Sequence, residues 1–198
     1  MKPLIIFHAH CSGELLAPLF RLDADAVTPA DYVSADHGFY PTVDDLNVDG
    51  REIFILDFSF PRKALDEMRS RAKSVVILDH HKTAEKTLAG FPGAIFDMTK
   101  SGAVMAWEYF HPGVPVPQLL QRVEDRDIWR WALLDSAAAM AYLDTRPFDF
   151  EVWDELARSF PLRYLEYGRQ LQSKLQAMAE AVAAEAEPKC SADARAIR

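Results

Sequence analysis

The stretch "VVILDHHKTAE", residues 75–85, decides the fold, because four apolar residues run directly into an acid, two histidines and a lysine. The apolar run is too short for a helix, and its uniform character predicts a strand that is buried on both faces. Asp79, His80 and His81 follow where that strand ends. Ligands bind at the carboxyl ends of strands in open parallel sheets, so these side chains are candidate site residues.

Short apolar runs alternate with longer amphipathic segments in the first half of the chain, a pattern typical of βαβ units. The predicted strands are residues 4–8, 31–35, 52–60, 74–81 and 93–99. The predicted helices are residues 13–21, 62–72 and 102–110, the last capped by Ser101, followed by helical spacing over 117–134, 150–160 and 163–187. We therefore expect an α/β fold: an open, mainly parallel five-stranded sheet with flanking helices, followed by a helical C-terminal region.

The chain length of 198 residues suits one substantial domain with an appendage. We expect an α/β domain over residues 1–131, a helical extension packed on it over 132–187, and a disordered tail over 188–198. The apolar stripe of the last helix is expected either to pack on its own domain or to pair between two subunits in a homodimer.

The composition excludes several classes of protein. A net charge of −8 argues against an extended nucleic-acid surface, although a short nucleotide remains compatible with it. Cys11 and Cys190 are the two cysteines and form no CxxC pair, which predicts neither a disulfide framework nor a structural zinc site. No apolar run is long enough for a signal peptide or a membrane span, so we expect a cytoplasmic protein without a membrane partner.

Several predicted strands end in side chains that bind metals. They are His8, His10, Asp57, Asp79 and His80. A single aspartate at a strand end is more often a turn former, but neighbouring strands that each deliver a ligand indicate a site. Nitrogen and oxygen donors without a thiolate pair suit Mn²⁺ or a similar ion. Asp57, on a central strand, is the natural acid to bridge two ions about 3.5–4 Å apart.

A second acidic cluster lies in "VEDRDIWRW", residues 123–131. By composition alone, its acids form a solvated helix face that pairs with neighbouring arginines. Trp129 and Trp131 beside it predict partial burial of the segment. The acids are Glu124, Asp125 and Asp127, and the arginines are Arg122, Arg126 and Arg130.

Four segments, in this order, resemble the motifs of the DHH phosphoesterases: "FILDFSFP", "ILDHH", "IFDMTKSGAVMAW" and "VEDRDIW". This family includes RecJ-like exonucleases, nano-RNases, cyclic-dinucleotide phosphodiesterases and manganese-dependent family II pyrophosphatases. The resemblance covers residues 3–131. It implies a divalent-metal-dependent phosphohydrolase or phosphodiesterase that holds two Mn²⁺ or Mg²⁺ ions and acts on a small nucleotide-like or oligonucleotide substrate.

The resemblance also implies roles for individual residues. Asp57, His80 and His81 would be catalytic, with Asp57 as the bridging acid and His81 facing the substrate phosphate. The metal ligands would be His8, His10, Asp57, Asp79, His80 and an acid of the fourth motif, Asp127 in the first place and Asp125 in the second. Substrate would contact His81, Lys82, Ser101 and Arg126.

The chain departs from the family pattern in two places. Ser12 stands before Gly13 where active members carry a metal-binding Asp, and the Gly-rich segment of a C-terminal substrate domain does not occur. These departures favour an alternative, a degenerate DHH domain that works as a binding or regulatory module. A separate chain that supplies the missing domain is the other explanation of the second departure. A third interpretation treats the acids and histidines as unrelated surface groups.

Overall fold

The computed structural model describes the chain except for a few segments, which are residues 9–29, 37, 39, 148–149, 161 and 187–198. The predicted helix over 13–21, the candidate ligand His10 and the predicted tail over 188–198 therefore lie outside the described residues.

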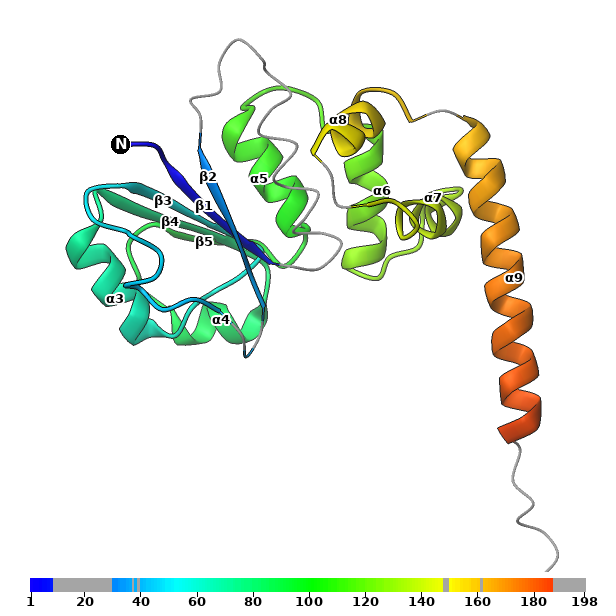
Figure 1. The fold of residues 1–198 in the computed structure, drawn as a ribbon, viewed down its shortest axis with the longest axis horizontal. Coiled ribbons are helices and arrows are strands. Elements are labelled where there is room, and N and C mark those ends of the chain that lie inside the picture. Colours follow the sequence, from blue (N-terminus) through cyan, green and yellow to red (C-terminus); the bar gives the residue numbers. More distant parts are fainter. Residues whose placement is uncertain (9–29, 37, 39, 148–149, 161, 187–198) are drawn as a thin grey trace, which may run out of the picture.

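Five parallel strands form one sheet in the order β2-β1-β3-β4-β5, which confirms the predicted fold class (Figure 1). The strands are β1 (Leu4–His8), β2 (Asp31–Ala35), β3 (Glu52–Leu56), β4 (Ser74–Asp79) and β5 (Ala94–Phe96). In the register of the sheet, Phe7 lies opposite Leu56, and Leu56 lies opposite Leu78. The carboxyl ends of the central strands are therefore level, so the residues that follow them meet at one edge.

The third strand ends four residues before the predicted end at residue 60. Asp57 has a φ of 55°, in the left-handed region that an extended strand does not use. Its amide still donates to the carbonyl of Leu78, at 2.8 Å, so the turn begins while the chain is tied to β4. The pattern of apolar residues continues through Phe60, and for this reason it does not reveal the turn.

Helices cover both faces of the sheet (Figure 1). On one face, α3 (Arg62–Arg71) and the short α4 (Lys82–Thr87) lie over a core that contains Ile55 and Ile77. On the other face, α5 (Gly102–Phe110) packs on Leu56. Burial on both faces explains why the central strands are continuously apolar rather than alternating.

The predicted helical C-terminal region follows α5 and shares its core (Figure 1). Its helices are α6 (Gln118–Asp127), α7 (Ser136–Leu143), α8 (Phe150–Arg158) and α9 (Leu162–Ala186). The predicted helical segment 117–134 ends at Asp127, whereas α7 was not predicted. Close packing ties α9 to α7, because a Cβ on Gly168 would lie 1.9 Å from the carbonyl oxygen of Ala138. No helix in the described part of the chain has the length and apolar character needed to cross a membrane.

Candidate metal centre

Asp57 is held at the carboxyl edge of the sheet by its backbone and by the start of α5. Its side chain is 1% exposed. Gly102, the first residue of α5, lies against the carboxylate, and a Cβ at this position would be 2.4 Å from the Asp57 Cβ and 2.6 Å from Oδ1. Real Cβ atoms do not approach so closely, so glycine at residue 102 is required for Asp57 to occupy this place.

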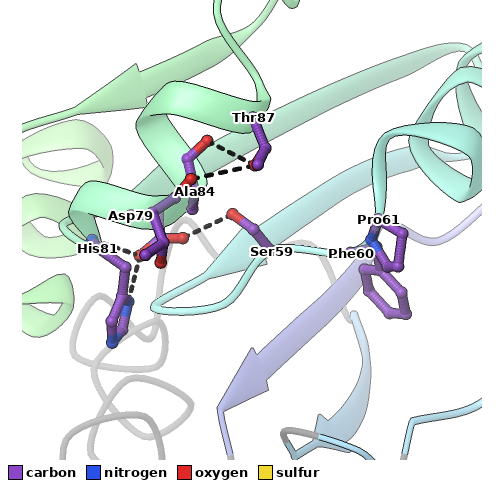
Figure 2. Close-up of a pocket in the computed structure, with 8 residues that line it drawn as sticks. Ser59, Phe60, Pro61, Asp79, His81, Ala84 and Thr87 are labelled. Carbon is purple, nitrogen blue, oxygen red and sulfur yellow. Dashed lines mark hydrogen bonds and ion pairs between the residues drawn. The ribbon is translucent and has the colours of Figure 1, made fainter.

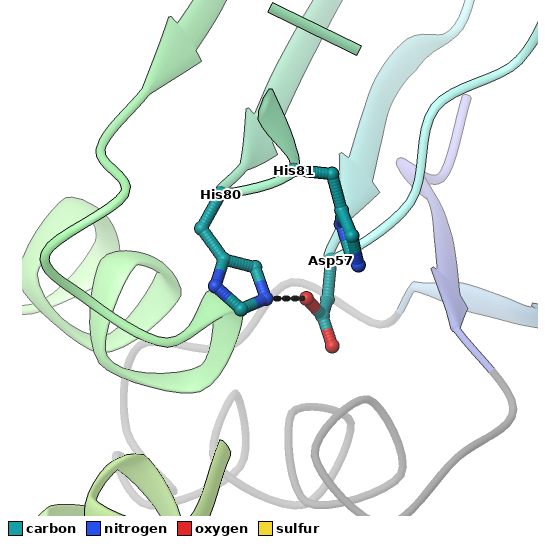
Figure 3. Close-up of side chains that lie close together, drawn as sticks. All are labelled: Asp57, His80 and His81. Carbon is teal, nitrogen blue, oxygen red and sulfur yellow. Dashed lines mark ion pairs between the residues drawn. The ribbon is translucent and has the colours of Figure 1, made fainter. Parts of the chain in front are cut away.

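His80 joins Asp57 to an acid from the helical region. The His80 Nε2 atom lies 3.0 Å from Asp57 Oδ1 and 3.5 Å from Asp127 Oδ2. Figure 3 shows His80 and Asp57 facing each other, with His81 beside them. The ligand atoms of Asp57, His80 and His81 all lie within 4.8 Å of one another. Side chains from the ends of β3, β4 and α6, distant in the sequence, thus converge on one point.

The charges of this cluster are only partly compensated. Burial of the His80 imidazole opposes its protonation, but the hydrogen bond to Asp57 and the charges of Asp57 and Asp127 raise its pKa above the ordinary value. Burial, together with the charge of Asp57, raises the pKa of Asp127 from 3.8 to about 6. A carboxylate with a raised pKa lacks sufficient positive charge around it, which a bound cation would supply.

His81 is oriented by Asp79, its neighbour two residues earlier. Asp79 Oδ1 lies 2.6 Å from His81 Nδ1 and accepts from the His81 amide at 3.0 Å, while Ser59 donates to Oδ2 at 2.5 Å. Burial disfavours the charged carboxylate, but the hydrogen bonds from His81 and Ser59 hold the pKa of Asp79 below its ordinary value. The hydrogen bond to Asp79 in turn raises the pKa of His81. This pairing fixes which ring nitrogen of His81 faces the Asp79 carboxylate.

A pocket of about 300 Å³ opens beside His81 (Figure 2). In the figure, Ser59 and His81 lie on either side of Asp79. The pocket is lined by Ser59, Phe60, Pro61, Asp79, His81, Thr83, Ala84 and Thr87. Hydroxyl groups, one imidazole and an apolar wall suit a small polar ligand.

Asp125 and Glu124 do not form the solvated face that composition predicts. Asp125 is buried, and its carboxylate accepts from the amides of Ala132 and Leu133 at 2.8 and 3.0 Å. Glu124 accepts from the amide of Ser101 at 3.1 Å. Both carboxylates therefore hold backbone amides in place. Of the two acids proposed for the fourth motif, the structure brings Asp127 to His80, whereas Asp125 points to a loop.

Four other candidates lie outside the cluster. His8 ends β1, where its ring stacks on Phe58 and its Nε2 atom lies 3.5 Å from Asp36 Oδ1. Ser101 is buried and caps α5, since its hydroxyl accepts from the amide of Val104.

The remaining two are basic. Lys82 begins α4 and is exposed. Arg126 contacts the Asp144 carboxylate at 3.0 and 3.2 Å, so its guanidinium already has an anionic partner. Substrate binding by either residue stays a prediction.

The expected partial burial of the segment is confirmed, since Asp125 is buried and Glu124 and Asp127 are half-buried, but the two tryptophans themselves point to solvent. Trp129 is 76% exposed and Trp131 is 39% exposed. Both have a positive φ, 58° and 50°, which places them on a tight loop after α6 and not on the predicted helix. The general tendency of large aromatic side chains to be buried does not hold where the backbone turns them outward.

Sequence reasoning missed several residues that shape the site. They are Gly102, Ser59, Thr83 and Thr87. Ser59 follows Asp57 within the same predicted strand, and alternation along a strand could have placed the two on one face. No sequence signal identifies Gly102, because its role depends on the close approach of α5 to β3.

Comparison with known proteins shows the fold but no function. No protein-family model matches the chain. Protein R106 of Acanthamoeba polyphaga mimivirus, which is uncharacterized, is 32% identical over 135 residues. The match spans 63% of this chain and 32% of R106, so the chain corresponds to about a third of that relative.

Among solved structures, an uncharacterized protein from Helicobacter pylori G27 is similar, with a TM-score of 0.63 and 11% sequence identity. The similarity covers 86% of this chain and 62% of that one. The molecule is therefore an α/β protein of a known fold, with a candidate metal centre at the carboxyl edge of its sheet.

Proposed function

We propose that the protein is a divalent-metal-dependent phosphohydrolase or phosphodiesterase related to the DHH phosphoesterases, acting on a small nucleotide-like or oligonucleotide substrate. One observation carries the proposal. Carboxylate oxygens of Asp57 and Asp127 lie 3.0 and 3.5 Å from the His80 Nε2 atom, although the three residues come from separate elements. The DHH-like motifs of the sequence supply these same residues, in the same order.

The side chains present fit a divalent ion. Asp127 Oδ2 is buried and accepts no hydrogen bond in the part of the chain that the structure describes. A buried carboxylate oxygen of this kind is costly unless a cation or donor reaches it. Carboxylate and imidazole donors favour Mn²⁺, with Mg²⁺ as the alternative. Asp57, His80 and Asp127 would hold such an ion, whose Lewis acidity would favour attack on a phosphate.

His81 and its partners act on the substrate in this proposal. The Asp79 carboxylate contacts one ring nitrogen and also accepts from the His81 amide, so it fixes the orientation of the imidazole at the end of β4. The raised pKa favours the protonated imidazole, the form that can bind a phosphate oxygen or donate to a leaving oxygen. The adjoining 300 Å³ pocket would receive a group attached to that phosphate.

Hydrolysis of bis(p-nitrophenyl) phosphate tests the proposal. We expect turnover that requires Mn²⁺ and stops in EDTA. Asp57→Asn should abolish it, because the variant keeps the shape of the side chain but loses its charge. Asp44→Asn, on a remote exposed acid, is the matched control and should keep full activity. Equal turnover by wild type and Asp57→Asn would refute the assignment.

A second candidate is the binding module. Ser12 in place of the first-motif Asp favours it, and so does the engagement of both Asp79 oxygens by Ser59 and His81. In that case Mn²⁺ binds and depends on Asp57, but no phosphoester is hydrolysed. Binding without turnover would therefore select this candidate.

A further inference from the structure

An exposed aromatic surface lies beyond the acid that reaches the cluster. The ring centroids of Trp129 and Trp131 are 5.4 Å apart, and the two ring planes are nearly perpendicular, at 80°. Trp129 is 76% exposed, and Trp131 is 39% exposed. Large apolar side chains that are grouped on a surface, unlike single scattered ones, indicate a binding site.

The backbone under this surface is in a disfavoured conformation. Trp129 and Trp131 both have a positive φ, a region that bulky residues rarely adopt. Such a conformation persists only where surrounding contacts enforce it, and it is commonly found at functional sites. A loop that only connected α6 to α7 would not need tryptophan at either position.

Buried Asp125 enforces the conformation. Its carbonyl oxygen accepts from the amides of Arg130 and Trp131, at 2.9 and 3.1 Å, while its carboxylate holds the next two amides. The guanidinium of Arg130 contacts Glu124 at 3.1 Å and donates to the carbonyl of Thr99. The loop is therefore fixed from its inner side, and the tryptophan rings stay available on the outer side.

The aromatic surface follows an acid of the proposed metal centre directly along the chain. Trp129 follows Asp127 by two residues, so their Cα atoms are separated by at most about 7 Å. Asp127 itself contacts His80. A ligand with its phosphate at the cluster would thus have its adjoining groups within reach of Trp129.

We propose that Trp129, supported by Trp131, is a stacking site for the planar heterocycle of a phosphate-containing ligand, such as a nucleobase. The placement of the phosphate rests on the proposed function, whereas the stacking surface rests on the loop. A tryptophan face offers contact area without a fixed pattern of donors and acceptors. Trp129 therefore selects for the presence of a base but not for its identity.

Calorimetry with Mn²⁺-loaded protein tests the site, with AMP and ribose 5-phosphate as probes that differ only in the base. Stacking on one aromatic side chain predicts that AMP binds about 5- to 150-fold more tightly. Trp129→Ala should reduce AMP affinity to that of ribose 5-phosphate and leave ribose 5-phosphate unchanged, and Trp129→Phe should restore most of the difference. Tyr167→Ala, which removes a half-exposed aromatic side chain from α9, is the control and should change neither.

Equal affinities for the two probes in the wild type, or an AMP preference that survives Trp129→Ala together with Trp131→Ala, would overturn the stacking site. An altered sedimentation coefficient in Trp129→Ala with both affinities unchanged would also overturn it and assign the surface to a protein contact.

The two proposals fail separately. Phosphoester hydrolysis without a preference for AMP keeps the enzyme and removes the stacking site. Trp129-dependent binding of adenosine, with no hydrolysis, keeps the stacking site and removes the enzyme.

Discussion

The two edges of the sheet hold charged clusters of different kinds. At the amino edge, where α3 leads into β4, Arg71 contacts Asp44 at 2.6 Å, Asp49 at 2.8 Å and Glu67 at 3.2 Å. These acids are exposed, and a guanidinium keeps its charge at every pH of interest. The cluster needs no ligand and connects α3 to the loop before β3.

At the carboxyl edge the partners are imidazoles. Asp57 and Asp127 share His80, and all three side chains are largely buried. Burial, together with the charge of Asp57, raises the pKa of Asp127, so its charged form is disfavoured there. Acid content alone therefore does not separate the proposed metal site from an exposed ion-pair cluster. The proposed site differs in its burial and in its imidazole partners, which can lose a proton when a cation binds.

Apart from the Asp57→Asn variant, the largest effect is expected from Gly102→Ala, which leaves every charged group in place. The new Cβ would overlap Asp57, so either α5 or the carboxylate must move. We expect a loss of about 1–3 kcal/mol in the free energy of unfolding. Mn²⁺ affinity should fall by at least about 10-fold, as for other residues that position ligands. Denaturant titration and calorimetry measure the two effects.

Gly168→Ala is the matched control for this prediction, because its Cβ would overlap Ala138 in the helical region. It should also lower stability, but the folded protein should bind Mn²⁺ as the wild type does. Loss of Mn²⁺ binding in both variants would mean that general destabilisation, and not the position of Asp57, controls the site.

Asp127→Asn should have opposite effects on stability and on binding. The folded pKa of Asp127, about 6, exceeds the ordinary 3.8. Folding therefore favours the protonated form, and this stabilisation is present below pH 3.8 and lost as the pH rises through 6. At pH 7, removing the charge should raise the unfolding free energy of the metal-free protein by about 1–3 kcal/mol. Mn²⁺ affinity should decrease.

Thermal melts of the metal-free variant and wild type between pH 4 and 7 check this result. The extra stability of the variant over the wild type should shrink as the pH falls, because the Asp127 carboxyl of the wild type then becomes protonated. A variant that is less stable than the wild type at pH 7 would contradict the view that the carboxyl edge carries unbalanced charge.

The smallest effect is expected from Arg71→Ala at the amino edge. The exposed pairs with Asp44, Asp49 and Glu67 are weakened by solvent and by salt. We expect a slight decrease in melting temperature that diminishes in high salt, with Mn²⁺ affinity unchanged. A change in Mn²⁺ affinity would show that the two edges are coupled and would weaken the comparison.

The sheet could be predicted from the sequence because its signals are local. The bounds of β1 and β2 match the predicted ranges. The α7 helix was missed for the opposite reason. Its sequence, "SAAAMAYL", is almost uniformly apolar and buried, so it has no polar face to give a helical period.

The site was only partly predictable. Strand ends identified Asp57 and His80, but the choice between Asp125 and Asp127 stayed open, because residues two apart on a helix point to different sides and only tertiary packing decides which side meets the sheet. The outward turn of Trp129 depends on amides held by Asp125, and the role of Gly102 depends on a contact across elements. Neither is visible in local sequence.

The most direct measurement is calorimetric titration of Mn²⁺ into the metal-stripped protein and its Asp57→Asn and Asp44→Asn variants. The account predicts tight binding to the wild type, the same binding to Asp44→Asn at the amino edge, and severe loss in Asp57→Asn. Absence of binding to the wild type, or equal binding by all three proteins, would contradict the claim that the carboxyl edge of the sheet is a metal centre.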